Sequence, residues 1–160
     1  MSLGRSQYFV SFIDDYSRHT WIYLIEKKSE VFDCFRNLEN LVEREIGRKI
    51  KCLRLNGGKQ YVSTQFNGYL QQMGIRCEFS CRYIPEQNGV PKRKNHSVVE
   101  AAQAMLEEKR LPKFYYAEVV RTAVYIQNRI GEKVSAHELY FGRKLNLRHL
   151  RVFGSISYVR

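Results

Sequence analysis

The start of the chain has the hydrophobic pattern of two β-strands. Residues 7–13 and 20–26 are two apolar, β-branched and aromatic runs, and the segment 14–19 between them is rich in Asp, Ser and other turn-forming residues. Two such runs joined by a short polar segment are typical of a β-hairpin. The pattern therefore predicts a hairpin over residues 7–26.

The period then changes to that of a helix. Between Ser29 and Gly47, apolar residues such as Val31, Phe35 and Leu38 recur at spacings that place them on one face. Ser29 is a residue type that favours the start of a helix, and Gly47 is one that ends a helix. We expect an amphipathic helix here, with one side packed against a sheet.

Strand-like and helical segments continue to alternate. We expect strands at 49–54 and 75–79, because both are short and mainly apolar or β-branched. Between them lies a helical pattern that Ser63 or Thr64 is expected to cap and that Gly74 is expected to end.

The remaining pattern is helical. Residues 80–91 contain two prolines and a glycine, so we expect a loop there. Helices are expected to follow at about 93–109 and 114–129. Taken in order, the elements predict an α/β fold without internal repeats.

Size and charge narrow the class of protein. The 160 residues are 44% hydrophobic, which is enough for one core of ordinary size. Lys and Arg number 27 against 16 acids, and the net charge of +11 favours nucleic acid or, as a weaker alternative, an anionic membrane surface. No segment reaches the roughly 18 continuous apolar residues of a membrane span, and a secretory signal is lacking. We expect a nuclear or cytoplasmic protein, not secreted, without a membrane or small-molecule partner.

Cysteine and histidine do not form a metal-binding pattern. Cys77 and Cys81 have a spacing found in metal sites, but no second Cys or His pair completes four zinc ligands. Without a secretory signal, the cysteines of a chain of this size are expected to stay reduced. We interpret all four as small apolar core residues: Cys34, Cys52, Cys77 and Cys81.

Three segments carry a family pattern. Residues 12–18 read Phe-Ile-Asp-Asp-Tyr-Ser-Arg, residues 53–58 read Leu-Arg-Leu-Asn-Gly-Gly, and residues 88–95 read Asn-Gly-Val-Pro-Lys-Arg-Lys-Asn. Thirty-five residues separate Asn56 from Lys92. In order and spacing, the segments resemble the catalytic core of copia-type retrotransposon integrases, which belong to the ribonuclease-H-like polynucleotidyl transferases.

The resemblance implies a ribonuclease-H-like α/β fold with a mixed sheet flanked by helices. In that fold the first strand lies mid-sheet and bears the first catalytic Asp, and we expect this central strand to be missing here. We interpret residues 1–130 as a partial integrase catalytic core. Residues 131–160 are interpreted as a basic post-core segment that offers five cations to an acidic partner: Arg143, Lys144, Arg148, Arg151 and Arg160.

The catalytic acids of the family are replaced in this chain. Asn56 stands where the resemblance implies an Asp, and Lys92 stands where it implies a Glu. The intact family uses Mg or Mn held by clustered carboxylates, whereas an amide is a weaker ligand and an ammonium repels the metals. We expect no intact catalytic residue and no cofactor here. Asp14 and Asp15 are candidates for relocated ligands, although their simpler role is to cap the hairpin turn.

The loop before the third acid keeps the family pattern. Residues 83–90 read Tyr-Ile-Pro-Glu-Gln-Asn-Gly-Val, and the resemblance places this loop beside bound DNA. The residues after it open a helix, whose N-terminus favours anions. The alternative is that Pro85, Gly89 and Val90 only shape and anchor a loop. The predicted nucleic-acid-binding residues are Gln87, Asn88, Lys92, Arg93, Lys94 and Asn95.

Together the patterns predict a degenerate retrotransposon integrase core fragment. The family inserts element DNA into host DNA, and this chain is expected to be limited to residual binding of nucleic acid, with DNA as the partner. The first alternative is a binding module that a host retains, in which the core holds DNA or RNA without cutting it. Three further alternatives stay open: a protein-interaction module that forms a homodimer, a nonfunctional remnant, and an enzyme whose metal ligands have moved.

Overall fold

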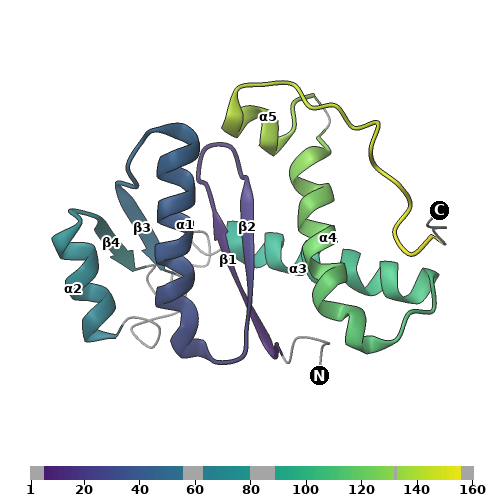
Figure 1. Cartoon of the computed structure of the whole chain (residues 1–160), viewed down its shortest axis with the longest axis horizontal. Helices are drawn as coiled ribbons and strands as arrows, with labels where there is room; N and C mark the ends of the chain where they lie inside the picture. Colours follow the sequence, from purple (N-terminus) through teal and green to yellow (C-terminus); the bar gives the residue numbers. More distant parts are fainter. Residues whose placement is uncertain (1–5, 56–62, 80–88, 132, 156–160) are drawn as a thin grey trace, which may run out of the picture. The chain divides into compact units, whose positions relative to one another are not determined.

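The computed structural model describes residues 6–55, 63–79, 89–131 and 133–155 (Figure 1). The chain divides into two compact units. The hairpin unit comprises Met1–Leu24 and Asn95–Arg160, and the inserted unit comprises Ile25–Lys94.

Two paired strands open the hairpin unit. They are β1 (Tyr8–Ile13) and β2 (Thr20–Ile25), hydrogen-bonded neighbours in a two-stranded sheet. Because the connection between them is too short for a crossover, the strands run antiparallel. The Asp14 N–H donates to the His19 carbonyl oxygen (2.9 Å) and closes the turn. The predicted hairpin is therefore confirmed.

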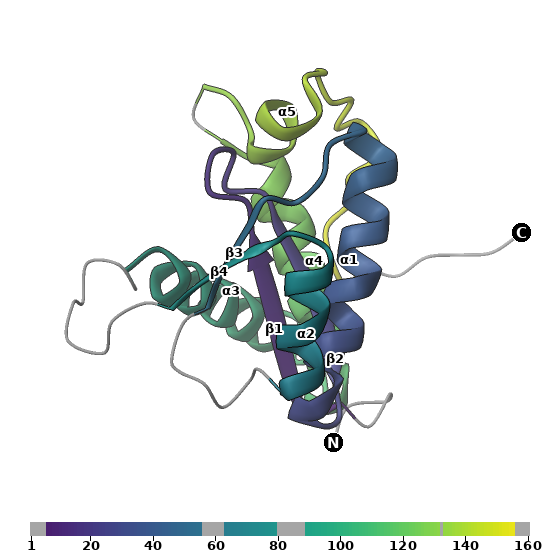
Figure 2. The same cartoon turned by 90° about the vertical axis from the view of Figure 1, so that its left-hand side faces the viewer.

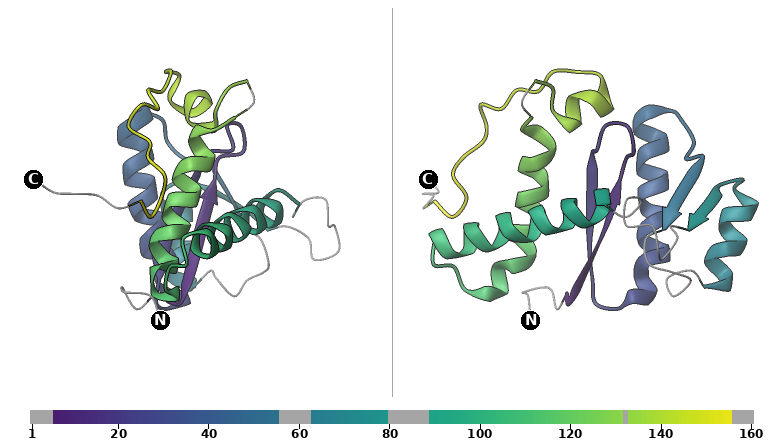
Figure 3. Two further views of the ribbon diagram at one scale, coloured as in Figure 1. Left: turned by 90° about the vertical axis from the view of Figure 1, so that its right-hand side faces the viewer. Right: turned by 180° about the vertical axis from the view of Figure 1, so that it is seen from behind.

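Helices form the rest of the described hairpin unit, to which α3 belongs from Asn95 onward. They are α3 (Gly89–Glu108), η4 (Lys113–Tyr115), α4 (Tyr116–Arg129) and α5 (Ala136–Phe141). Small aliphatic side chains of α3 and α4, among them Ala102 and Val120, share one buried cluster. The two helices predicted after the loop are confirmed, and Figure 3 shows both.

α3 begins earlier than its sequence pattern predicts. Its first residue is Gly89, so the loop predicted over residues 80–91 is wrong at its last three positions. Pro91 is the third residue of the helix. Because the first N–H groups of a helix have no partner within it, a proline at this position removes no hydrogen bond. Residues 80–88 lie outside the described part of the chain.

The inserted unit alternates helices and short strands. Its elements are η1 (Lys28–Glu30), α1 (Val31–Ile46), β3 (Cys52–Leu55), α2 (Thr64–Gln72) and β4 (Arg76–Phe79). Gly47 ends α1 in the left-handed conformation (φ 70°), which a glycine adopts without strain. Ser63 caps α2 by accepting the Phe66 N–H (3.1 Å). The predicted end of α1 and cap of α2 are confirmed. The predicted start at Ser29 is wrong, because Ser29 lies within η1 and the N-cap of α1 is Glu30.

β3 and β4 are parallel. Cys52 lies opposite Arg76, and Leu55 lies opposite Phe79. β3 starts later than the predicted residue 49, because its pairing with β4 begins only at Cys52. A parallel pair needs a crossover connection, and the segment that contains α2 supplies it.

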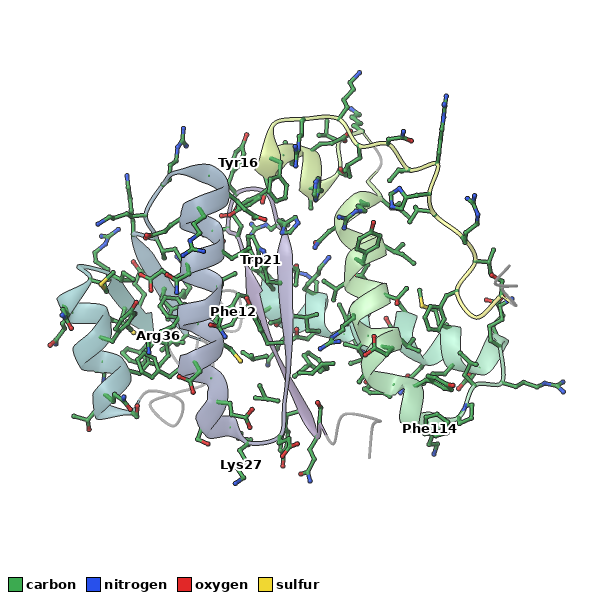
Figure 4. All side chains as sticks on the ribbon, in the orientation of Figure 1. Phe12, Tyr16, Trp21, Lys27, Arg36 and Phe114 are labelled. Carbon is green, nitrogen blue, oxygen red and sulfur yellow. The ribbon has the colours of Figure 1, made fainter. Side chains whose placement is uncertain are left out.

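α1 and α2 lie side by side in the inserted unit (Figure 2). Aromatic rings pack one helix against the other. The centroid of the Phe66 ring on α2 lies 5.0 Å from that of Phe32 and 5.3 Å from that of Phe35, both on α1. The Arg36 side chain also reaches from α1 to α2, with its guanidinium carbon 5.7 Å from the centroid of the Tyr69 ring (Figure 4). The apolar face predicted for α1 is therefore buried.

The described strands form two two-stranded sheets, β1 with β2 and β3 with β4. The α/β class is confirmed, but these strands do not form the single mixed sheet that the family resemblance implies. The resemblance implies a further strand in the middle of the sheet, and the strands of the described residues are the four of these two pairs. Within the same residues, no helix is long and apolar enough to cross a lipid bilayer.

α5 is an element that the hydrophobic pattern did not predict. Its N-terminus is closed by a capping box, in which the Ser135 Oγ accepts the Glu138 N–H (3.2 Å) and Glu138 Oε2 accepts the Ser135 N–H (3.0 Å). Gly142 ends the helix at φ 67°. The helix lies within residues 131–160, so the basic post-core segment contains folded structure.

Candidate nucleic-acid interface

The two positions where the family resemblance implies acids differ in what the structure shows. Asn56 lies outside the described residues. Lys92 is exposed in the first turns of α3, the helix that begins at Gly89. Its ammonium stands where the resemblance implies a carboxylate, and an ammonium repels divalent cations. Among the described residues, no group of three or more His, Cys, Asp or Glu side chains is placed to hold a metal. The described residues thus do not fit a two-metal site.

The acids of the hairpin turn are engaged within the turn. Asp14 Oδ2 accepts hydrogen bonds from the Ser17 N–H (2.8 Å) and the Ser17 hydroxyl (2.7 Å). Asp15 Oδ1 pairs with Arg18 Nη1 at 2.8 Å, on the surface. Arg18 has a positive φ of 63°, which such turn contacts hold in place. The turn-capping role predicted for these acids is confirmed for Asp14, which bonds the backbone of Ser17, whereas the contact of Asp15 is with the Arg18 side chain.

Three of the predicted nucleic-acid-binding residues, Lys92, Arg93 and Lys94, are consecutive cations near the start of α3. Lys92 and Arg93 are exposed, whereas Lys94 is half-buried. Burial lowers the pKa of the Lys94 ammonium, because a charge loses its solvation there. Gln87 and Asn88, which precede the helix, lie outside the described residues.

Arg93 folds back along α3 toward the N-terminus of the helix. A Cβ atom added to Gly89 would lie 3.2 Å from Arg93 Nη1 and 3.4 Å from Nη2. The guanidinium thus lies beside the first residue of the helix, where backbone N–H groups have no partner within the helix. Glycine at this position leaves room for the guanidinium.

Asn95 has a structural contact. Its Oδ1 accepts a hydrogen bond from the Ser11 hydroxyl of β1 (2.8 Å), across 84 positions of sequence. The side-chain oxygen of Asn95 therefore ties α3 to the hairpin within the hairpin unit. No spacing in the sequence indicates this contact, because it joins two distant elements.

Charge along α3 is arranged against the helix dipole. The first turn contains no acid and the last turn contains no base. Cations stand near the N-terminus instead, and acids such as Glu107 and Glu108 stand near the C-terminus. A helix N-terminus carries partial positive charge, so cations beside it repel that end of the helix and attract anions. An anion bound there would attract both the cations and the helix N-terminus, and would thus offset the repulsion between them.

A second group of cations, which belongs to the hairpin unit, was only partly predicted. Arg129 lies over the ring of Tyr125, with Cζ 3.5 Å from the ring centroid. The hydroxyl of Tyr125 is hydrogen-bonded to His149 Nε2 (2.6 Å). Tyr125 and Arg129 are four positions apart on one helix, a spacing that indicates contact. His149 belongs to the predicted basic segment, but nothing in the sequence pairs it with Tyr125.

The described cysteines are unreactive thiols. Cys34, Cys52 and Cys77 are free thiols, and Cys81 lies outside the described residues. Burial is the main factor that raises the pKa of all three thiols. A raised pKa keeps a thiol protonated and unreactive.

Comparison with known families now assigns the chain. The integrase core domain matches residues 2–85, which is more than half of the chain. The chain belongs to the integrase core family. It is 41% identical over 161 residues to the retrovirus-related Pol polyprotein from transposon TNT 1-94 of Nicotiana tabacum. This match covers 98% of the chain but only 12% of the polyprotein, so the chain corresponds to a small part of that relative.

Solved structures share the fold of this integrase core. The simian T-cell lymphotropic virus intasome in complex with PP2A regulatory subunit B56 gamma matches with a TM-score of 0.66 and 15% identity, over 95% of this chain and 51% of that chain. The HTLV-2 integrase catalytic core domain in complex with magnesium, in a trimeric form, matches with a TM-score of 0.62 and 14% identity, over 81% of this chain and 82% of that chain. At these identities the likeness shows the ribonuclease-H-like fold alone.

Proposed function

We propose that this integrase core no longer performs metal-dependent strand transfer and binds nucleic acid through the first turns of α3. The observation that carries the proposal is a run of three cations, Lys92, Arg93 and Lys94, where the family resemblance implies a catalytic acid. The ancestral activity is the insertion of element DNA into host DNA. DNA is accordingly the partner that we test.

The electrostatics of α3 favour a bound anion. Each cation near a helix N-terminus is unfavourable by about 0.3–1 kcal/mol in the absence of an anion. A phosphate group would accept hydrogen bonds from the free backbone N–H groups and neutralise the cations at the same time. The inverted charge of α3 is thus a cost that phosphate binding offsets.

The side chains of this surface suit the phosphate backbone and not particular bases. Lys92 provides a compact charge, and Arg93 provides a planar fork that binds phosphate oxygens in pairs. The position of the Arg93 guanidinium beside Gly89 brings it to the end of the helix where phosphate would bind. Contacts of this kind position a duplex without reading its sequence. We therefore expect binding that depends on salt and only weakly on DNA sequence.

The same residues disfavour catalysis by the family route. The carboxylates of such a site hold two divalent metals, and a lysine in place of one of them changes the local charge by about two units. Asn56 supplies a neutral amide where another acid is implied. Asp14 is already hydrogen-bonded to Ser17 in the hairpin turn, so it is poorly placed to replace either acid.

A salt titration of DNA binding tests the proposal. We would measure the binding of the chain to a labelled duplex of about 30 base pairs by fluorescence anisotropy, between about 50 and 200 mM salt. The variant Lys92→Gln with Arg93→Gln should lower the slope of log affinity against log salt by about two, because about 0.9 counterions are released for each phosphate contact. The control Arg44→Gln with Lys49→Gln removes two exposed cations of the inserted unit and should leave the slope nearly unchanged.

Activity is tested separately, with supercoiled plasmid and manganese. The proposal expects no nicking. Nicks that Asp15→Asn abolishes would show an enzyme with relocated ligands and would contradict the catalytic half of the proposal. If the chain does not bind DNA near physiological salt, the binding half of the proposal is contradicted and a nonfunctional remnant is favoured.

A further inference from the structure

The residues after α5 run alongside α4 toward the end of α3 within the hairpin unit (Figure 3). We call residues 143–155 the strap. It contains no regular secondary structure, yet its contacts with the folded elements recur along its length. Near its start, the Leu145 N–H donates to Glu138 Oε1 of α5 (3.4 Å). In its middle, His149 is bonded to Tyr125 of α4.

The end of the strap is held by apolar packing. Phe153 packs against the buried cluster that α3 and α4 share. Gly154 passes so close to Lys109 that an added Cβ would lie 3.0 Å from its Cγ atom. Gly154 also has a positive φ of 74°, so a side chain there would be strained for two reasons. The strap is therefore anchored at its start, middle and end.

The strap is cationic throughout. From residue 139 to residue 160 the sequence has five Lys or Arg residues and no acid. Within the described residues, Arg143, Lys144, Arg148 and Arg151 are all exposed, and none forms an ion pair with a carboxylate. Arg151 instead donates from Nη1 to the carbonyl oxygens of Arg148 (2.8 Å) and Leu150 (3.0 Å).

Arg129 links the strap cations to α4. Its guanidinium covers the Tyr125 ring, whose hydroxyl holds His149 in the strap. Arg129 and Arg143 both act on buried His137 of α5, where their positive charges help to lower the pKa of the imidazole. The cations of α4 and of the strap thus lie around the same elements, where Glu138 of α5 is the acid whose charge opposes theirs.

We infer that Arg129 together with the strap cations forms a second nucleic-acid-binding surface on the hairpin unit, in addition to the first turns of α3. The inference rests on the proposed DNA binding and adds a surface to it. Cations carried on an anchored segment lose less conformational entropy on binding than cations on a free tail. Each phosphate that a strap cation contacts releases counterions from the nucleic acid, which adds to the affinity.

Phosphate in nucleic acid fits this surface better than a membrane does. A segment that lies in a membrane surface through apolar contacts uses an amphipathic helix with a continuous apolar face, and the strap has no helix. The Leu145, Leu150 and Phe153 side chains are partly buried by the unit itself. Two apolar side chains of the strap, Leu147 and Val152, are exposed, against four exposed cations. Arginine binds phosphate oxygens in pairs and is the residue that recognises the nucleic-acid backbone most often.

The experiment compares three variants of the full chain by the salt titration described above. The strap variant combines Arg143→Gln, Arg148→Gln and Arg151→Gln, and we expect it to lower the salt slope by about two to three. The matched control combines Arg44→Gln, Arg48→Gln and Lys49→Gln, three exposed cations of the inserted unit, and should change the slope by less than about one. The α3 variant, Lys92→Gln with Arg93→Gln, reports on the proposed function by itself.

The outcomes separate this inference from the proposed function. If the α3 variant loses slope and the strap variant behaves like its matched control, the second surface does not exist but the proposed function stands. If the parent chain does not bind DNA, both fail. If the strap variant loses binding to anionic lipid vesicles and keeps its binding to DNA, the partner is a membrane and the inference is overturned.

Limited proteolysis of the unaltered chain provides a readout that does not depend on the folding of a variant. Trypsin cleaves after lysine and arginine, so Arg148 and Arg151 are exposed cleavage sites in the strap. Saturating duplex DNA should slow cleavage at these two sites by at least tenfold relative to cleavage at Arg44. Equal rates at all three sites would overturn the inference.

Discussion

The side-chain amide of Asn128 is hydrogen-bonded to both backbone groups of Thr20. Asn128 Oδ1 accepts the Thr20 N–H (2.9 Å), and Asn128 Nδ2 donates to the Thr20 carbonyl oxygen (2.7 Å). Both residues are buried, at 4% and 2% exposure. Asn128 is in the last turn of α4 and Thr20 is the first residue of β2, 108 positions earlier. The amide thus bonds Thr20 as the backbone of a neighbouring strand would.

Replacing Asn128 by alanine should destabilise the hairpin unit. The substitution leaves the N–H and the carbonyl group of Thr20 buried without their partner, at a cost of about 1–3 kcal/mol for each group. We expect Asn128→Ala to lower the free energy of unfolding by about 2–4 kcal/mol in total. Urea unfolding followed by the near-ultraviolet circular dichroism of Trp21, which belongs to the same unit, measures this loss.

The matched control for this prediction is Asn40→Ala. Asn40 is exposed on α1, so its removal should change the free energy of unfolding by less than about 0.5 kcal/mol. If Asn128→Ala changed stability as little as Asn40→Ala, the amide pairing would not contribute to the fold in solution.

Acid should destabilise the packing of α5 through His137. This residue is 8% exposed, and its ring centroid lies 4.3 Å from that of Phe141 and 5.6 Å from that of His19. Burial lowers the pKa of His137, and the positive charges of Arg129 and Arg143 lower it further, against an opposing effect of Glu138. His137 is therefore neutral in the folded chain at neutral pH.

The sign of the pH dependence follows from this shift. Unfolded His137 titrates near its ordinary pKa of about 6.5, whereas the folded residue titrates lower. Its contribution to stability is complete above about pH 6.5 and is lost as the pH falls through the folded pKa. The melting temperature, followed by the fluorescence of Trp21, should fall between about pH 7.5 and pH 5.5.

Two variants test whether His137 causes this pH dependence. His137→Phe keeps an aromatic ring and removes the titrating group, so the melting temperature should depend less on pH in this range. His96→Gln removes an exposed histidine of α3 and should leave the dependence as it is in the parent chain. The same dependence in His137→Phe as in the parent would assign the effect to another group.

A buried carboxylate links the two helices of the inserted unit. Glu39 of α1 is 3% exposed, and its Oε2 accepts a hydrogen bond from the Tyr69 hydroxyl of α2 (2.5 Å). Its other oxygen, Oε1, has no hydrogen-bond partner among the described residues. The bond to Glu39 is the main factor that raises the pKa of Tyr69. The Tyr69 hydroxyl is therefore the group that makes the burial of this carboxylate tolerable.

Removing that hydroxyl should cost more than removing both partners. Tyr69→Phe leaves Glu39 buried without a donor and should lower the free energy of unfolding by about 2–4 kcal/mol. The double variant Tyr69→Phe with Glu39→Leu replaces the pair by apolar groups and should recover at least half of that loss. Thermal unfolding of both variants measures the order, and Tyr16→Phe, at 81% exposure, is the neutral control. A double variant less stable than Tyr69→Phe would contradict this account.

The parts of the fold that depend on local patterns could be predicted from the sequence. The hairpin follows from two apolar runs around a polar turn, the end of α1 follows from Gly47, and the limits of α2 follow from Ser63 and Gly74. Each of these residues acts on its immediate neighbours: Gly47 and Gly74 both have a φ of 70°, and Ser63 bonds the backbone three residues later. Local chemistry of this kind is present in the sequence itself.

Contacts between distant residues could not be predicted. Asn95 with Ser11, and Asn128 with Thr20, join elements 84 and 108 positions apart, and nothing in one partner indicates the other. α5 was missed for a different reason. Its capping residue Ser135 is visible in the sequence, but the helix has only six residues, too few for a helical period.

The candidate site was predicted in part for the same reason. The cations at the start of α3 were predicted because they are consecutive in the sequence. The sequence did not predict which of them are exposed: Lys94 is half-buried, whereas Lys92 and Arg93 are exposed. The anchoring of the strap by Tyr125 also needed the structure, because that bond links residues 24 positions apart. Gln87, Asn88 and Asn56 lie outside the described residues, so their roles stay predictions.

Restoring the implied acids should weaken DNA binding without creating an enzyme. The variant Asn56→Asp with Lys92→Glu introduces two carboxylates and lowers the net charge of the chain by three units, two of them at the start of α3. It should lower the affinity for duplex DNA at about 100 mM salt at least tenfold, because an acid now repels phosphate where Lys92 attracted it. Nicking of supercoiled plasmid with manganese should stay absent, since Asp14 remains bonded within the hairpin turn.

Anisotropy and the plasmid assay measure the two effects on one sample, with Arg44→Glu as the control for added negative charge. Nicking by this variant would mean that a third acid already lies in reach, and the residue to examine would be Asp15, whose partner Arg18 is exposed and easily displaced.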